Sequence, residues 1–327
     1  MPHPIHRSSK ICARIALFVA AAAAVAGPGR AWGEGIPAGE GQVVAWGLDT
    51  VGQGSVPKEA QEGVSAVAAG AFHNLALKQG CVLAWGQNSD GQTDVPAEAR
   101  AGVSAIAAGA NHSLALKGGR VIAWGQNTSG QGKVPKEALE GVTAIAAGDT
   151  HSLALKGGKV LVWGSNLSGI LKVPSELKSG VTAIAAGQWH GLALKGGRVI
   201  EWGSLRVPAD DPQKNPDGLK QDAAHLVPEE ARAGVSSIVA NLSVSMALKN
   251  GRLIAWKHEP LVLPAEAQSG ISIVAAGSSH YLAVRAGKVL AWGDNKHGQT
   301  TVPPAALSGV IAIAGGFGHS LALTVKQ

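Results

Sequence analysis

The stretch that decides the fold covers residues 121–158 and reads VIAWGQNTSGQGKVPKEALEGVTAIAAGDTHSLALKGG. It contains three short apolar runs, VIAWG, VTAIAAG and HSLAL, separated by glycine-rich segments. Runs of this length bounded by glycine are typical of β-strands. The Gly-Gly pair that follows HSLAL favours a tight hairpin, because glycine readily adopts positive φ. The stretch therefore predicts a short antiparallel sheet.

Copies of this stretch fill most of the chain. The tryptophan of the first run recurs every 39 residues, and twice more after an insertion and a deletion, at Trp46, Trp85, Trp124, Trp163, Trp202, Trp256 and Trp292. Repeats of about 40 residues bury their apolar faces against neighbouring copies. The first run begins near residue 43 and the last HSLAL covers 319–323, so these two can pair. We expect an all-β, seven-bladed β-propeller over residues 42–327, closed as a ring by its N- and C-terminal strands.

Two segments depart from the repeat. Residues 1–26 combine a basic start with a short apolar run and small residues, which predicts a secretory signal peptide with cleavage after residue 26 or as late as residue 31. Polar residues 206–226 lengthen the fifth blade and predict an exposed loop. Two interpretations of this loop stay open, a tolerated surface insertion and part of a partner site. We expect a secreted or periplasmic product without a membrane span.

The charge balance argues against a nucleic-acid partner. The chain has 28 basic and 22 acidic residues, and three of the basic residues, Arg7, Lys10 and Arg14, belong to the predicted signal peptide. No lysine and arginine cluster marks a phosphate-tracking stripe. One cysteine, Cys81, remains after residue 26, so no internal disulfide is expected. A closed ring has no need of a second copy, and we expect a monomer.

Six histidines occupy the same position of the repeat, at His73, His112, His151, His190, His280 and His319. In the remaining copy this position is Val244. Catalytic and metal sites need different groups that converge on one point, whereas these are spread around a ring. We therefore expect each imidazole to tie its strand to a neighbouring backbone group. Asn88, Asp90 and Asp94 faintly resemble a calcium loop, but turns prefer the same residues. We expect no catalytic residue, metal or cofactor.

The phrase A-A-G-x-x-H-S-L-A-L, followed by a strand that ends in W-G, resembles the regulator of chromosome condensation family over residues 43–323. The connecting phrases VPAEARAGVSAIAAG and DNKHGQTTVP are similar to those of exported bacterial propellers of this family that inhibit β-lactamases. This resemblance implies a seven-bladed ring that binds class A β-lactamases through loops on one face. It also implies contacts just before the histidine position, at Phe72, Asn111, Thr150, Trp189, Ser243, Ser279 and Gly318.

Residues that break the repeat on these loops are the candidate partner-binding residues. They are Phe72, Trp189, Asn111, Asp149, Thr150, Gln188, Phe317, Asp49, Asp90 and Asp294. Phe72 and Trp189 lead this set because aromatic anchors dominate protein interfaces. The sequence predicts an exported, non-enzymatic protein-binding propeller, with inhibition of a class A β-lactamase as its sharpest form. The alternative is a propeller that binds glycans or the cell envelope.

Overall fold

The computed structural model describes residues 41–203, 227–241, 244–256 and 262–325. The predicted signal peptide and the 206–226 insertion lie outside the described residues. Within these ranges the chain is built from β-strands joined by turns and short 3₁₀ helices, which confirms the all-β, propeller-like prediction. No helix in the described ranges is long and apolar enough to cross a membrane.

The strands form antiparallel sheets of three, which we call units. Each unit takes its first two strands from one copy of the repeated stretch and its third strand from the next copy. In chain order they are β2 (Val64–Ala69), β3 (His73–Lys78) and β4 (Cys81–Gly86); β5 (Val103–Ala108), β6 (His112–Lys117) and β7 (Arg120–Gly125); β8 (Val142–Ala147), β9 (His151–Lys156) and β10 (Lys159–Gly164); β11 (Val181–Ala186), β12 (His190–Lys195) and β13 (Arg198–Gly203); β14 (Ser237–Ala240), β15 (Ser245–Lys249) and β16 (Arg252–Trp256); and β17 (Ile271–Ala276), β18 (His280–Arg285) and β19 (Lys288–Gly293).

The chain's two ends share the remaining sheet. Strand β1 (Gly41–Gly47) pairs with β21 (His319–Val325) along its whole length, and β21 also pairs with β20 (Val310–Gly315). The expected pairing of the first and last strands is therefore confirmed. One further residue pair, Gly41 with Val64, joins β1 to β2 and makes this a six-stranded sheet.

Glycine makes the turn of each hairpin possible. Gly118 and Gly119, between β6 and β7, have φ of 56° and 80°. An L-residue with a Cβ is strained in this left-handed region, whereas glycine is not. The predicted hairpins between HSLAL and the following strand are confirmed by the pairing of β6 with β7 and of its counterparts in the other units.

Among the described residues, a short 3₁₀ helix follows the proline of each V-P or L-P step. Proline fixes φ near −65°, as at Pro57, and so starts the turn in a defined direction. One apolar residue of each helix is fully buried and anchors it to the sheets. The helices are η1 (Lys58–Ala60), η2 (Ala97–Arg100), η3 (Lys136–Leu139), η4 (Ser175–Lys178), η6 (Glu229–Arg232), η7 (Ala265–Gln268) and η8 (Pro304–Ala306).

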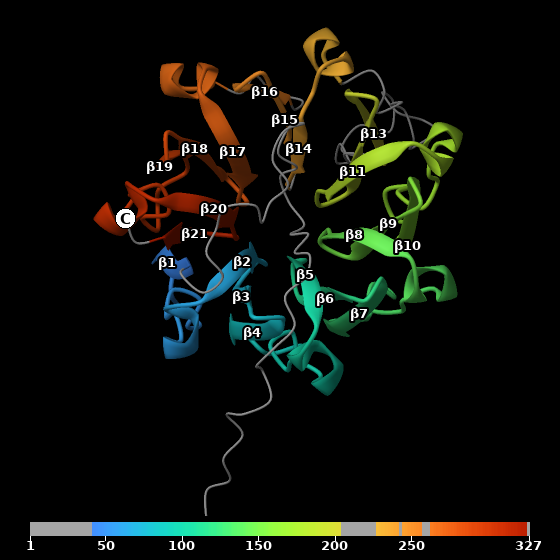
Figure 1. Cartoon of the computed structure of the whole chain (residues 1–327), viewed down its shortest axis with the longest axis horizontal. Coiled ribbons are helices and arrows are strands. Elements are labelled where there is room, and N and C mark those ends of the chain that lie inside the picture. The colour runs from blue at the N-terminus through green and yellow to red at the C-terminus, as the bar shows by residue number, and fades with distance from the viewer. Residues whose placement is uncertain (1–40, 204–226, 242–243, 257–261, 326–327) are drawn as a thin grey trace, which may run out of the picture.

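The units lie side by side around a common axis (Figure 1). The first strand of each unit contacts the first strand of the next, and β2 also contacts β20. Apolar clusters fill the space between successive units; one holds residues of both β5–β7 and β8–β10. This arrangement gives the molecule two ends. We call the end that carries the loops between first and second strands the loop end, and the opposite end the hairpin end.

Histidine side chains connect successive units near the loop end. Nε2 of His73 lies 3.0 Å from Oγ of Ser113, whose hydroxyl donates to the carbonyl oxygen of Gln92. Because that hydroxyl has a single hydrogen, the imidazole must be the donor in its bond to Ser113. Equivalent contacts join His112 to Ser152, His190 to Ser245, His280 to Ser320 and His319 to Asn74.

The structural role of these histidines is confirmed, but their Nε2 contacts go to side chains rather than to the backbone. Each of these five Nε2 contacts goes to a side chain of the next unit. A backbone hydrogen bond also acts on His73, from Ala110, and on His280, from His319. His151 differs from the other five. The residue that would face it is Gly191, and its Nε2 is buried without a partner in the described chain.

This difference predicts unequal effects of two matched substitutions. His112→Leu breaks a buried hydrogen bond and should lower the free energy of unfolding by about 1 to 3 kcal/mol. His151→Leu removes a buried nitrogen that already lacks a partner, so its cost should stay within about 1 kcal/mol. Urea unfolding at neutral pH measures both. Equal losses in the two variants would contradict the hydrogen-bond assignment.

Candidate functional site

Loops at the loop end hold the residue before each histidine through its backbone carbonyl. The carbonyl oxygens of Phe72, Asn111 and Thr150 accept hydrogen bonds from the amides of Gln87, Gln126 and Ser165, each at 2.9 Å. The same bond recurs from Asp294 to Ser279 and from Leu48 to Gly318. Because backbone groups fix this position, its side chain can vary between units without loss of the fold. The loop end is therefore where the sequence can encode a binding site.

Two phenylalanines meet where the first and last loops of the chain adjoin. The ring centroids of Phe72 and Phe317 lie 5.1 Å apart at a tilt of 34°, and the Phe317 amide donates to the Ala71 carbonyl oxygen. Phe72 is half-buried, whereas 47% of Phe317 is exposed. The sequence selected both residues separately. Only the structure shows that they form one aromatic surface.

A second group lies on the loops of two other successive units. Asp149 accepts a hydrogen bond from the Gln188 side chain, and Trp189 follows directly in the chain. Burial raises the pKa of Asp149, and the hydrogen bond from Gln188 partly opposes this. Asp149, Gln188 and Trp189 are each half-buried. They combine a carboxylate, an amide and an indole, which suits contact with a polar and aromatic protein surface.

The other predicted residues have a more local role or none that the structure defines. Asp49 accepts from the Gly54 amide at 2.7 Å and the Ser55 hydroxyl at 2.9 Å, so it closes its own loop. Asp294 likewise accepts from the Gln299 side chain at 3.0 Å. Asp90 is exposed, and Asn111 and Thr150 are half-buried. Ser243 lies outside the described residues.

Several exposed apolar residues on the loops of this end escaped the sequence prediction, and Leu167 is more exposed than Val51 and Leu171. Leu167, on the loop that follows Trp163, is 66% exposed. The equivalent residues of three other loops are Thr50, Ser89 and Thr128, all small and polar. A comparison of the repeats would have found Leu167, because it puts a large apolar residue at a loop position where those other copies have a small polar one.

The buried polar cluster around Glu201 has a structural character. Glu201 stands where other units carry alanine or valine, and its carboxylate accepts from the Ser245 hydroxyl and the Trp256 indole, both at 2.8 Å. In five other units the tryptophan indole donates to a backbone carbonyl instead, as Trp85 does to Gln53. Burial raises the pKa of Glu201, while the bonds from Trp256 and Ser245 lower it. The carboxylate replaces a backbone acceptor.

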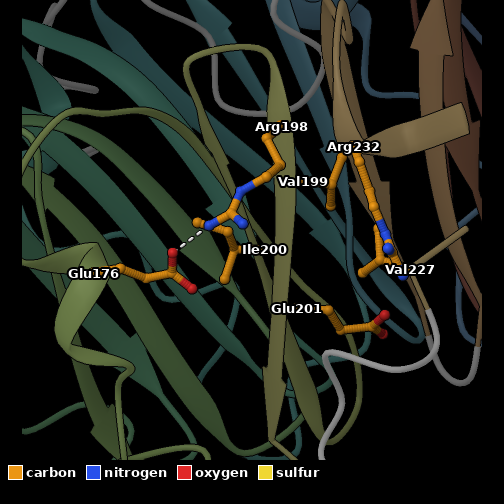
Figure 2. Close-up of a pocket in the computed structure, with 7 residues that line it drawn as sticks. All are labelled: Glu176, Arg198, Val199, Ile200, Glu201, Val227 and Arg232. Carbon is orange, nitrogen blue, oxygen red and sulfur yellow. Dashed lines mark hydrogen bonds and ion pairs between the residues drawn. The ribbon is translucent and has the colours of Figure 1, made fainter. Parts of the chain in front are cut away.

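A pocket adjoins this cluster and is shown in Figure 2. It is lined by Glu176, Arg198, Val199, Ile200, Glu201, Val227 and Arg232. Arg198 pairs with Glu176, and Arg232 lies 3.8 Å from Glu229. Its charged groups are thus engaged with the protein itself. Among the described residues, no group of three or more histidine, cysteine and carboxylate side chains is arranged to hold a metal ion.

Comparison with known proteins identifies the repeat. The model of the regulator of chromosome condensation (RCC1) repeat matches residues 64–92, 103–131, 142–170 and 271–299. Each segment begins at the first strand of a unit and ends in the loop after its third strand, at Gln92, Gln131, Ile170 and Gln299. No curated protein sequence matches the chain.

Solved structures show the same fold at low sequence identity. Prp20p of Saccharomyces cerevisiae is 19% identical with a TM-score of 0.66, covering 88% of this chain and 92% of that one. Prp20 in complex with Kap60 is also 19% identical, with a TM-score of 0.69 and coverage of 100% and 97%. Human WBSCR16 is 17% identical, with a TM-score of 0.67 and coverage of 87% and 100%.

Proposed function

Since the chain carries RCC1 repeats on a propeller-like fold, we propose that it is an exported, non-enzymatic propeller that binds another protein through its loop end. The single observation that carries this proposal is the Phe72–Phe317 pair, because it places two aromatic rings together at the loop end while 47% of Phe317 stays exposed. Exposed aromatic side chains are a common source of interface energy. Solved structures of the same fold include yeast Prp20p, studied for binding to Gsp1p and histones, and Prp20 bound to Kap60.

The proposal includes a ring of seven blades. Six units are continuous in sequence, and the pairing of β1 with β21 and β20 supplies a seventh from the two ends of the chain. Contact between β2 and β20 supports closure of the ring. A closed ring keeps the loops of all blades at fixed separations, so a partner can contact several of them without ordering a flexible surface.

The partner class that we propose is a class A β-lactamase. Two connecting phrases, at residues 95–109 and 294–303, resemble those of β-lactamase inhibitory protein II, and residues 1–26 have the pattern of an export signal. Export would bring the protein to the compartments in which β-lactamases act. The loop end would then cover the entrance of the enzyme's active site and block substrate entry.

Titration of class A β-lactamases with the purified protein tests this proposal. Hydrolysis of a chromogenic substrate should fall in proportion to the protein added until the enzyme is saturated. Phe72→Ala and Trp189→Ala should each weaken inhibition about 30-fold, because a buried aromatic anchor contributes about 2 kcal/mol. Ser279→Ala changes the equivalent position of another unit and should alter inhibition less than about 2-fold.

Two outcomes would contradict the proposal. Unchanged hydrolysis across the panel, at a protein concentration of about 10 μM, would exclude β-lactamase inhibition of useful affinity. Saturable binding to peptidoglycan or polysaccharide, unaffected by Phe72→Ala and Trp189→Ala, would favour the glycan or cell-envelope alternative. Inhibition that all three alanine variants retain in full would place the contact surface away from the residues before the histidines.

A further inference from the structure

Lysine and arginine residues recur at equivalent positions around the hairpin end. Each hairpin is flanked by cations, and the 3₁₀ helices add more. These elements hold sixteen lysines and arginines, Lys58, Lys78, Arg100, Lys117, Arg120, Lys136, Lys156, Lys159, Lys178, Lys195, Arg198, Arg232, Lys249, Arg252, Arg285 and Lys288. They hold nine glutamates, Glu59, Glu62, Glu98, Glu137, Glu140, Glu176, Glu229, Glu230 and Glu266.

The opposite end has the reverse balance. Its described loops carry Asp49, Asp90, Asp94, Asp149 and Asp294 together with Lys133, Lys172 and Lys296. The two ends of the molecule therefore differ in sign. A charge difference of this kind orients a protein in the field of an anionic partner, with the hairpin end toward it.

Backbone bonds hold the hairpins at one level around the axis. The Gly80 carbonyl oxygen accepts from the Val103 amide of the next unit at 3.0 Å, and the Gly119 carbonyl oxygen accepts from Val142 at 2.9 Å. The same bond recurs for hairpins at 158, 197, 251 and 287. A Cβ added at Gly118, Gly157 or Gly196 would meet no atom within 4 Å, so these hairpin tips project into open space.

Six exposed cations lie next to these tips: Arg120, Lys159, Arg198, Arg252, Arg285 and Lys288. Three of them pair with a glutamate on a 3₁₀ helix, Lys159 with Glu137, Arg198 with Glu176 and Arg252 with Glu230. Within the described ranges, Arg120, Arg285 and Lys288 form no ion pair. Arg120 lies three units away from the hairpin of Arg285 and Lys288 on one path around the ring, so the unneutralised charge is spread over the end.

We propose that the hairpin end is a docking surface for an anionic lipid bilayer. A ring of cations at one level matches a flat layer of acidic headgroups, whereas a rod-like polyanion would reach only part of it. The tips are made of Gln79-Gly80, Gly118-Gly119, Gly157-Gly158, Gly196-Gly197, Asn250-Gly251 and Ala286-Gly287. With no large apolar side chain there to insert, binding is electrostatic and occurs at the headgroup level.

Cosedimentation of the protein that begins at residue 27, without the predicted signal peptide, with lipid vesicles tests this surface. Vesicles that contain phosphatidylglycerol should bind the protein at about 20 mM salt and release it near 0.5 M, because salt screens exposed charges. Vesicles of phosphatidylcholine alone should not bind it. Removal of three unpaired cations in R120Q/R285Q/K288Q should weaken partitioning about 100-fold, since each contributes roughly a factor of 5 near an acidic membrane.

A matched control separates the surface from net charge. K133Q/K172Q/K296Q also removes three positive charges, but from the loop end, and should change partitioning less than about 3-fold. Thermal unfolding of both variants verifies that they remain folded. Equal losses in the two triple variants would overturn the proposal, as would absence of binding to acidic vesicles at low salt. Binding to duplex DNA but not to vesicles would assign the surface to a different polyanion and would also overturn it.

Discussion

Acidification from pH 7 to pH 5 is expected to remove most of the protein's stability. The cause is the set of buried histidines that lie between successive units. Burial is the largest cause that lowers the pKa of each, to about 3 for His73, His112 and His190 and about 4 for His151, His280 and His319. Repulsion between neighbouring histidines adds to this for four of them, while Asp294 and Asp49 oppose it at His280 and His319.

The sign of the effect follows from proton binding. An unfolded histidine has a pKa of about 6.5, so between pH 6.5 and pH 4 the unfolded chain binds protons that the folded chain excludes. The stabilisation is complete above pH 6.5 and is lost as the pH falls toward the folded values. At pH 5 each buried histidine lowers the free energy of unfolding by about 2 kcal/mol relative to neutral pH. Six histidines together lower it by on the order of 10 kcal/mol, which equals the whole stability of a typical domain.

Urea unfolding at several pH values between 7.5 and 4.5 measures this loss. The unfolding midpoint should fall steeply below pH 6.5 with little change in slope, because the exposed surface stays the same. The raised pKa of Glu201 acts in the opposite direction, since its folded state retains a proton longer, but one group opposes six. H297Q removes an exposed histidine and should leave the profile unchanged. A midpoint that does not move between pH 7 and pH 5 would refute the prediction.

Glu201→Ala is expected to lower the free energy of unfolding by about 3 to 5 kcal/mol. A loss of this size would be unusual for a change to alanine here, because other repeats carry alanine at the same position, at Ala84, Ala123 and Ala291. In those units the carbonyl of a loop residue accepts the tryptophan indole. Here the carboxylate is the acceptor, and its removal leaves the Trp256 indole and the Ser245 hydroxyl without their partner in a buried cluster.

Glu201→Gln provides the matched control. The amide oxygen keeps one acceptor and nearly the same volume, so the loss should be smaller, about 1 to 2 kcal/mol. Chemical unfolding at pH 7 compares the two variants, and the fluorescence of Trp256 reports on its surroundings. Were Glu201→Ala as stable as the natural chain, the carboxylate would have no acceptor role.

The sequence predicted the repeat and its strands because local signals carry them. Short apolar runs and hairpin glycines each act within a few residues, and the antiparallel pairing of β6 with β7 follows directly from them. The candidate site was predicted only as a set of separate residues. Contact between Phe72 and Phe317, which are 245 positions apart, depends on how the two ends of the chain meet.

The sequence showed the strands more clearly than it showed where the charged residues gather in the folded chain. No linear stretch of the chain is strongly basic, and the cations seemed dispersed. The repeat places them at equivalent positions of successive hairpins, so that folding gathers them at one end. Periodicity in a propeller maps distant residues onto one ring, and linear clustering is therefore the wrong measure of a charged surface in such a chain.

The sequence alone determined an all-β array of three-stranded units, because each unit's strands and turns are encoded by consecutive short segments of the chain. Tertiary structure decided which units touch and what each exception does. His151 Nε2 has no partner because the next unit has Gly191 at the facing position, and Glu201 accepts a hydrogen bond from the Trp256 indole of another unit. These relations join residues of different units. Their energies depend on distances that only the packing of units around one axis sets.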